Sequence, residues 1–173
     1  LAKRAGHLVF SGMKGPVEFK NLRIKELSRA TSLPAPVQRL PASAPQVSIP
    51  AADKDGFAPM FDGVTLNGWK GATVGYRMAG GILTSPDGEG DLITEKKYSS
   101  FHLKFDLKLS SGSNNGIGVW CDDDKGTNRF LVHTGFEIAL IDDKAQEYRR
   151  LEKWQKHGSL TYFEEPSSHP MNA

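Results

Sequence analysis

Hydrophobic and polar side chains alternate most regularly in residues 101–109. Every second residue from Phe101 to Leu109 is apolar, and a histidine, lysine or aspartate stands at each position between them. Side chains of a β-strand point alternately to its two faces, so this segment predicts a strand with one buried and one wet face. Such two-sided strands are typical of antiparallel sheets.

Shorter apolar segments predict strands in several other parts of the chain. They cover residues 6–10, 17–24, 80–84, 92–94, 116–120 and 136–141. In the second of these the alternation changes phase at Lys20-Asn21, which predicts a β-bulge. Only residues 145–154 repeat with a helical period, and we expect a short helix there. Together with 18 glycines and 10 prolines, the pattern predicts an all-β fold with many turns.

Residues 28–55 differ in composition from the segments on either side. Five prolines stand there among alanine, serine and glutamine, with few large apolar residues. Proline removes a backbone donor and restricts its neighbour, so we expect an extended linker rather than a strand or helix. The sequence therefore divides into residues 1–27, a linker at residues 28–55, and residues 56–173.

Charge and composition exclude several classes of partner. The formal net charge is +2, with acidic and basic residues scattered along the chain, so no basic patch predicts nucleic-acid binding. No apolar run reaches the roughly 20 residues that a membrane-spanning helix needs. The one cysteine, Cys121, has no basic neighbour that would mark it as a nucleophile, and we expect it in the core or at its rim.

A motif near the middle of the chain points to a family. Residues 57–69, FAPMFDGVTLNGW, combine a Phe-Asp-Gly turn with a Leu-x-Gly-Trp segment. This motif resembles the opening of the 3-keto-disaccharide hydrolase family, and five more segments follow in the order expected for it: residues 81–83, 91–94, 114–118, 136–143 and 154–159. The resemblance implies a concanavalin/laminin-G-like antiparallel β-sandwich, or jelly roll. It also implies a glycoside substrate and a periplasmic or extracellular location.

The N-terminal segment is similar to a different part of the same family. Residues 6–27 resemble its closing strands, whereas residues 56–159 resemble its opening and central part. In a tandem protein, residues 1–27 would end one copy of the domain and residues 56–173 would begin an incomplete second copy in the same chain. In a permuted sandwich, residues 1–27 would instead supply strands to the second unit, because about 28 extended linker residues can span a small domain.

The resemblance implies acid–base chemistry on a glycoside that is oxidised to a ketone at C3. Such a ketone makes the C2 proton acidic, so a base can remove it and the group at C1 can leave before water adds. The candidate catalytic residues are Glu137, Asp142, Asp143 and His157. A hydrogen-bond donor or a divalent metal would hold the enolate charge. The three aspartates at residues 122–124 lack the ligand spacing of a cation loop, and we expect a solvated loop there.

Each candidate also has an ordinary structural interpretation. Glu137 is either a site residue or a charged residue on a wet sheet face, and a lone histidine such as His157 is more often structural. The candidate substrate-binding residues are Asn114, Asn115, Trp154 and Gln155. Residues 114–116, Asn-Asn-Gly, are also an ordinary turn sequence, and Trp154 also suits a core.

The sequence departs from the family pattern at several positions. Ala139 stands where the family usually carries a glutamine two residues after the strand glutamate. Ser11 and Met13-Lys14 stand where its closing strands usually carry glutamine and His-Gly. Three functions remain open: a hydrolase or lyase, a non-catalytic carbohydrate-binding module, and a structural fragment that needs further strands.

Overall fold

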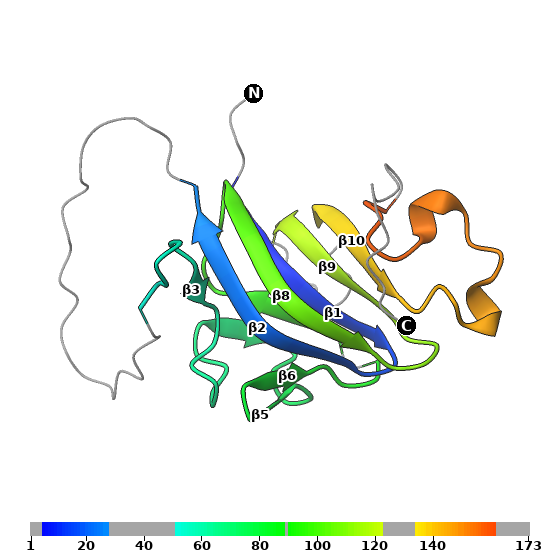
Figure 1. Cartoon of the computed structure of the whole chain (residues 1–173), viewed down its shortest axis with the longest axis horizontal. Helices are drawn as coiled ribbons and strands as arrows, with labels where there is room; N and C mark the ends of the chain where they lie inside the picture. The colour runs from blue at the N-terminus through cyan, green and yellow to red at the C-terminus, as the bar shows by residue number, and fades with distance from the viewer. Residues whose placement is uncertain (1–4, 28–50, 89, 123–133, 162–173) are drawn as a thin grey trace.

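The computed structural model describes residues 5–27, 51–88, 90–122 and 134–161. Its strands are β1 His7–Lys14, β2 Val17–Glu26, β3 Ala58–Pro59, β4 Trp69–Gly71, β5 Arg77–Ala79, β6 Ile82–Thr84, β7 Gly90–Thr94, β8 Phe101–Leu109, β9 Asn114–Cys121 and β10 Phe136–Ile141. They form two antiparallel sheets (Figure 1). The first has the strand order β10-β9-β1-β7-β4; the second has the order β3-β2-β6-β5, with β8 also paired to β2. The predicted all-β sandwich is confirmed.

Strands β1 and β2, one in each sheet, lie inside the sandwich rather than beside it. β1 pairs with both β7 and β9, and β2 pairs with β8, β3 and β6. Between the two strands, Gly15 has a φ of 69°, a backbone conformation that favours glycine. Residues 7–26 and residues 58–141 therefore share one pair of sheets and one core.

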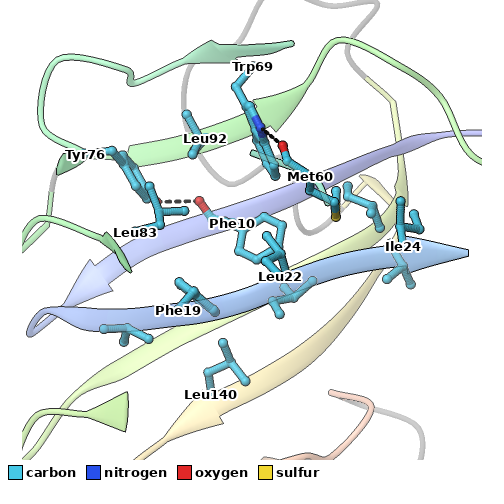
Figure 2. Close-up of a cluster of buried hydrophobic side chains, with 14 of the residues drawn as sticks. Phe10, Phe19, Leu22, Ile24, Met60, Trp69, Tyr76, Leu83, Leu92 and Leu140 are labelled. Carbon is cyan, nitrogen blue, oxygen red and sulfur yellow. Dashed lines mark hydrogen bonds between the residues drawn. The ribbon is translucent and has the colours of Figure 1, made fainter. Parts of the chain in front are cut away.

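Aromatic side chains from both sheets fill the core (Figure 2). The ring of Phe10 in β1 meets Phe19 of β2 at 5.0 Å and Trp69 of β4 at 5.3 Å between centroids, edge to face in both cases. The Trp69 indole N–H donates to the Met60 carbonyl at 2.9 Å, and the Tyr76 hydroxyl donates to the Phe10 carbonyl at 2.6 Å. These bonds allow two polar aromatic side chains to be buried with their donors satisfied.

The β-bulge predicted in residues 17–24 is present in β2. The register with β8 shifts after Lys20, and Asn21 takes a φ of 53°. One extra residue on the bulged strand reverses the side-chain phase beyond it. As a result Leu22 and Ile24 are buried in the same core as Phe19, which a regular strand would not allow.

Most predicted strands have the predicted position, but the predicted helix is wrong. β8 and β10 begin and end as the alternation predicts, while β9 begins at Asn114, so residues 114 and 115 are strand residues rather than a turn. In place of a helix over residues 145–154, the chain has two 3-10 helices, η2 Gln146–Tyr148 and η3 Lys153–Gln155. Neither buries a residue. Short helices depend on the burial of an apolar face, and no residue of either 3-10 helix is fully buried.

Two expectations about the rest of the chain fall partly outside the described residues. Of the predicted linker, residues 28–50 lie outside them, and residues 51–55 contain neither strand nor helix. Within the described part of the chain, no helix is long and apolar enough to cross a membrane.

Candidate functional site

Strand β10 presents different residues to its two sides. Leu140 belongs to the core, and Phe136 and Ile138 pack against it. Glu137 and Ala139 alternate with these residues, so they point to the outer face of the sheet. We call this outer face the carboxylate face; its central members are Ser11, Asp91, Gly116, Gly118, Glu137 and Ala139.

Strand register places four of these residues in one row across the sheet. Asp91 of β7 is opposite Ser11 of β1, Ser11 is opposite Gly116 of β9, and Gly116 is opposite Ala139 of β10. Neighbouring strands lie about 4.8 Å apart, so side chains within such a row are adjacent. The row has a carboxylate at one end, followed by three small residues.

The carboxyl group of Glu137 also reaches this row. Glu137 lies two residues before Ala139 in β10 and points to the same face. A Cβ atom added at Gly116 would lie 2.4 Å from the Glu137 Oε1 atom, which means that the carboxyl group rests directly over this glycine. Any side chain at residue 116 would displace it. Glu137 is only 9% exposed and Asp91 only 3%. The face therefore holds two buried carboxyl groups on either side of small residues, an arrangement suited to acid–base work.

Cys121 lies on the same face and is unsuited to nucleophilic chemistry. It packs with Val9 and Ile93 in a small apolar cluster. Burial raises the pKa of its thiol to about 12, and the nearby Asp91 and Glu137 carboxylates add to this rise. A thiol held in this way is protonated at neutral pH. Cys121 is a buried structural residue, as the sequence predicts.

Two other candidates, Asp142 and His157, line a cleft on the opposite side of β10. The cleft lies between β8 and β10, has a volume of about 860 Å³, and is lined by Phe105, Leu107, Leu109, Ile138, Leu140, Asp142 and His157 among others. Its apolar lining belongs to the core faces of the two strands. The sequence prediction grouped Glu137 with Asp142 and His157, whereas in the structure β10 lies between them.

Hydrogen bonds show what the two aspartates do in the fold. The Asp142 carboxylate accepts from the Gly112 amide at 3.0 Å, and the Asp142 amide donates to the Ser113 carbonyl at 2.9 Å. The Asp143 carboxylate accepts from the His157 amide at 3.3 Å. Asp142 thus holds the loop before β9, and Asp143 holds the segment that follows η3.

The predicted substrate-binding residues also have structural contacts. Asn115 is 1% exposed and makes three hydrogen bonds to the turn between β1 and β2. The Gln155 side chain accepts from the Glu152 amide at 3.0 Å and so caps η3. Trp154 in the same 3-10 helix is half-buried, as is Asn114 at the start of β9.

The described residues do not fit a metal ion. Among them, no group of three or more histidine, cysteine, aspartate or glutamate side chains is placed to hold one. Of the three aspartates at residues 122–124, the last two lie outside the described residues. We therefore derive no step of the chemistry through a metal.

Asp91 is the residue that sequence reasoning missed. Residues 91–94 contributed to the family resemblance, but the carboxylate itself received no role. One signal was available, because a charged residue precedes the apolar pair Leu92-Ile93 in a predicted strand. A charge inside a strand is rarely fully buried unless it is paired or used, and Asp91 is buried.

The fold and the carboxylate face define an antiparallel β-sandwich of the jelly-roll type with an acidic candidate site on one sheet. The chain belongs to a known family of such proteins: residues 56–172 match the family described as the 3-keto-alpha-glucoside-1,2-lyase-like domain. The resemblance drawn from the sequence motifs is thereby confirmed.

One curated relative is informative about the extent of the match. A 3-keto-disaccharide hydrolase of Bacteroides thetaiotaomicron is 33% identical over 142 residues, which cover 70% of this chain and 49% of the relative. The chain thus spans about half the length of the curated relative that it matches. No solved structure matches it.

Proposed function

We propose that this protein is a carbohydrate-active hydrolase that cleaves 3-keto-glycosides on the carboxylate face, with Glu137 as the base. Family membership and the name of the relative support the substrate class. The observation that carries the proposal is the position of Glu137: its buried carboxyl group rests over Gly116, in the row that also holds Ser11 and Ala139. We place the sugar beside the carboxyl group, over these small residues.

The chemistry needs a base, an acid and water. Glu137 would remove the proton from C2, which the C3 ketone makes acidic, and the bond from C1 to the leaving oxygen would then break. The departing alcohol takes up a proton, for which Asp91 at the other end of the row is the proposed donor. Water adds at C1 and a proton returns to C2, so one water is consumed and two sugars are released. His157 and Asp142 line the cleft on the other side of β10 and receive no role in this proposal.

Binding without turnover is the second candidate function. It is favoured by the positions of Ser11 and Ala139, the two sites where a family glutamine is replaced. Both stand in the row that contains Asp91 and Gly116. Two amides are thereby absent from one row, and amide groups are well suited to bind sugar hydroxyls. A chain that binds the sugar but releases no product would establish this alternative.

The deciding experiment compares two glutamate variants. The purified chain is incubated with a 3-keto-disaccharide, and released monosaccharide is measured. Glu137→Gln keeps the shape of the side chain but removes the base, so it is expected to abolish release. The matched control is Glu95→Gln, because Glu95 is exposed and follows the end of β7; its turnover should equal that of the unchanged chain. Equal loss in both variants, or none in either, would contradict the assignment of Glu137.

We also propose that residues 7–26 complete the sandwich of residues 56–161 in permuted order. The proposal is supported by the pairing of β1 between β7 and β9 and by the burial of Phe10 and Phe19. A chain that begins at residue 51 would lack both aromatic side chains. We expect it to lose cooperative thermal unfolding, whereas a chain with residues 7–26 attached through a shortened linker should retain it.

A further inference from the structure

A bulge at the end of β1 puts a lysine on the carboxylate face. Ser11 of β1 is opposite Gly116 of β9. Lys14, three residues further along β1, is opposite Asn114, which is only two residues from Gly116 in β9. The extra residue in β1 is a β-bulge, and it reverses the side-chain phase beyond it. Lys14 therefore points to the same side of the sheet as Ser11, whereas in a regular strand it would point into the core.

The side chain of Asn115 holds this bulge in place. Its Oδ1 atom accepts from the Met13 amide at 2.9 Å, and its Nδ2 atom donates to the carbonyls of Lys14 and Gly15, each at 3.0 Å. Because Asn115 is almost fully buried, the backbone around Lys14 is fixed to β9. The base of the lysine side chain thus has a defined position beside the row of small residues, although the side chain itself is 56% exposed.

Two residues of the 3-10 helix η2 hold the ammonium group of Lys14. It forms an ion pair with Glu147, donates to the Tyr148 hydroxyl at 3.4 Å, and lies 5.4 Å from the centroid of the Tyr148 ring. The hydrogen bond with Glu147 raises the pKa of Lys14, so the group is charged at neutral pH. An ammonium has three N–H donors, so it can bind a ligand oxygen together with both of these partners.

The reaction proposed above creates a negative charge that must be stabilised. When Glu137 takes the C2 proton, the electrons of the C2–H bond form a double bond between C2 and C3, and the π electrons of the ketone move to the C3 oxygen. A cation or hydrogen-bond donor beside that oxygen lowers the barrier to this enolate. Such a group has to lie on the same face as Glu137 and about one sugar ring away from it.

Strand register places Lys14 at such a distance. The Glu137 carboxyl group rests over Gly116, and Lys14 lies one strand away from Gly116 and two residues further along the sheet. The usual strand spacing and rise put the Cα atoms of Lys14 and Gly116 about 8 Å apart. A second lysine on this face, Lys70 of β4, is opposite Ile93. It is four strands away from β10, so Lys14 is the better placed of the two.

We propose that Lys14 is a catalytic residue whose ammonium binds the C3 oxygen of the keto-sugar and stabilises the enolate. This inference rests on the proposed function. When the enolate collapses, the C3 carbonyl re-forms, a double bond forms between C1 and C2, and the bond from C1 to the leaving oxygen breaks. That oxygen takes its proton from Asp91, so Lys14 gives up no proton and only holds charge. The family pattern usually has a glycine at this position, and the resemblance therefore does not supply this role.

The test follows exchange of the C2 hydrogen for deuterium, because this exchange reports enolate formation separately from cleavage. The whole chain is incubated in heavy water with a methyl 3-keto-glucoside, and the C2 signal is measured by NMR. K14M keeps the length of the side chain but removes its charge and donors. It should slow the exchange about 100-fold, the usual effect of removing one donor to a developing oxyanion. K14R keeps charge and donors and should retain much of the rate.

Two further variants separate this role from a structural one. Lys96 is the matched control: it forms an ion pair with Glu26, lies 5.3 Å from the centroid of the Tyr98 ring, and is 58% exposed. K96M should therefore exchange the C2 hydrogen as fast as the unchanged chain. E147Q removes the ion pair from its other side and leaves the Lys14 ammonium, so it should keep most of the rate.

Three results would overturn the role of Lys14. Unchanged exchange in K14M, with exchange lost in Glu137→Gln, would remove Lys14 from the reaction and leave the proposed function standing. Equal loss in K14M and E147Q would make Lys14 an anchor of η2 rather than a catalytic residue. No exchange by the unchanged chain would contradict the proposed function, and the role of Lys14 with it.

Discussion

Replacing Asn115 with alanine should destabilise the fold, because this side chain fastens β9 to a turn about a hundred residues earlier. Its Oδ1 atom accepts from the Met13 amide at 2.9 Å, and its Nδ2 atom donates to the carbonyls of Lys14 and Gly15, both at 3.0 Å. The side chain is almost fully buried. No water can therefore replace it without rearrangement of the turn.

The size of the effect follows from these three bonds. Each contributes about 1 kcal/mol net, so the loss of all three is about 3 kcal/mol in total. Domains have about 5–15 kcal/mol of stability, so this is a large fraction. In a chain of this length it corresponds to a fall in the melting temperature of roughly 6–12 °C.

Urea unfolding followed by tryptophan fluorescence measures the difference directly. Asn114→Ala is the matched control, since residue 114 has the same side chain in the same strand but is half-buried and alternates to the other face. We expect the control to change the unfolding free energy by less than about 0.5 kcal/mol. Equal stability of the two variants would contradict a structural role for Asn115. Loss of sugar binding in Asn115→Ala at unchanged stability would assign this side chain to the binding site instead.

Three further results are expected. Gly116→Ala should displace the Glu137 carboxyl group, because the new Cβ would lie 2.4 Å from Oε1, and should reduce sugar turnover as strongly as Glu137→Gln; wild-type turnover would show that this position of the carboxyl group is not needed. Cys121, with its thiol pKa raised by burial to about 12, should react with a thiol reagent only in urea, and rapid labelling of the native chain would contradict this. Hydrogen bonds from the Thr65 hydroxyl and amide lower the pKa of Asp62. Their contribution to stability is complete above pH 3.8, the ordinary pKa of an aspartate, and is lost as the pH falls through the lowered pKa of the folded state. Asp62→Ala should therefore weaken the fold in urea titrations at about pH 7 and match the unchanged chain at about pH 2.

The sequence pattern was sufficient to predict features that depend on the side chains of a single strand. The alternation in residues 101–109 and 136–141 sets the bounds of β8 and β10, and the phase change at Lys20-Asn21 locates the bulge. In each case the side-chain period of two is a property of the strand itself. At residues 145–154 the predicted helix is replaced by two short 3-10 helices, and neither of them buries a residue.

The grouping of polar residues could not be predicted in the same way. Asn115 has the sequence context of a sugar-binding turn, yet its partners are residues 13–15. Asp91 received no role, yet the register of β7 with β1 puts it in one row with Ser11 and Gly116. Conversely, Glu137 and Asp142 are five residues apart on one strand and its end, but they face opposite sides of β10.

The sequence by itself determined the class, the family and the positions of the main strands, because these depend on local periodicity and on short motifs. Only the tertiary structure decided that residues 7–26 form the interior strands of both sheets, and which side chains meet on the carboxylate face. Those outcomes depend on register between strands up to about a hundred residues apart. Register is set by the burial of whole strand faces against one another, and a shift of one residue would turn each strand's polar set to the other side.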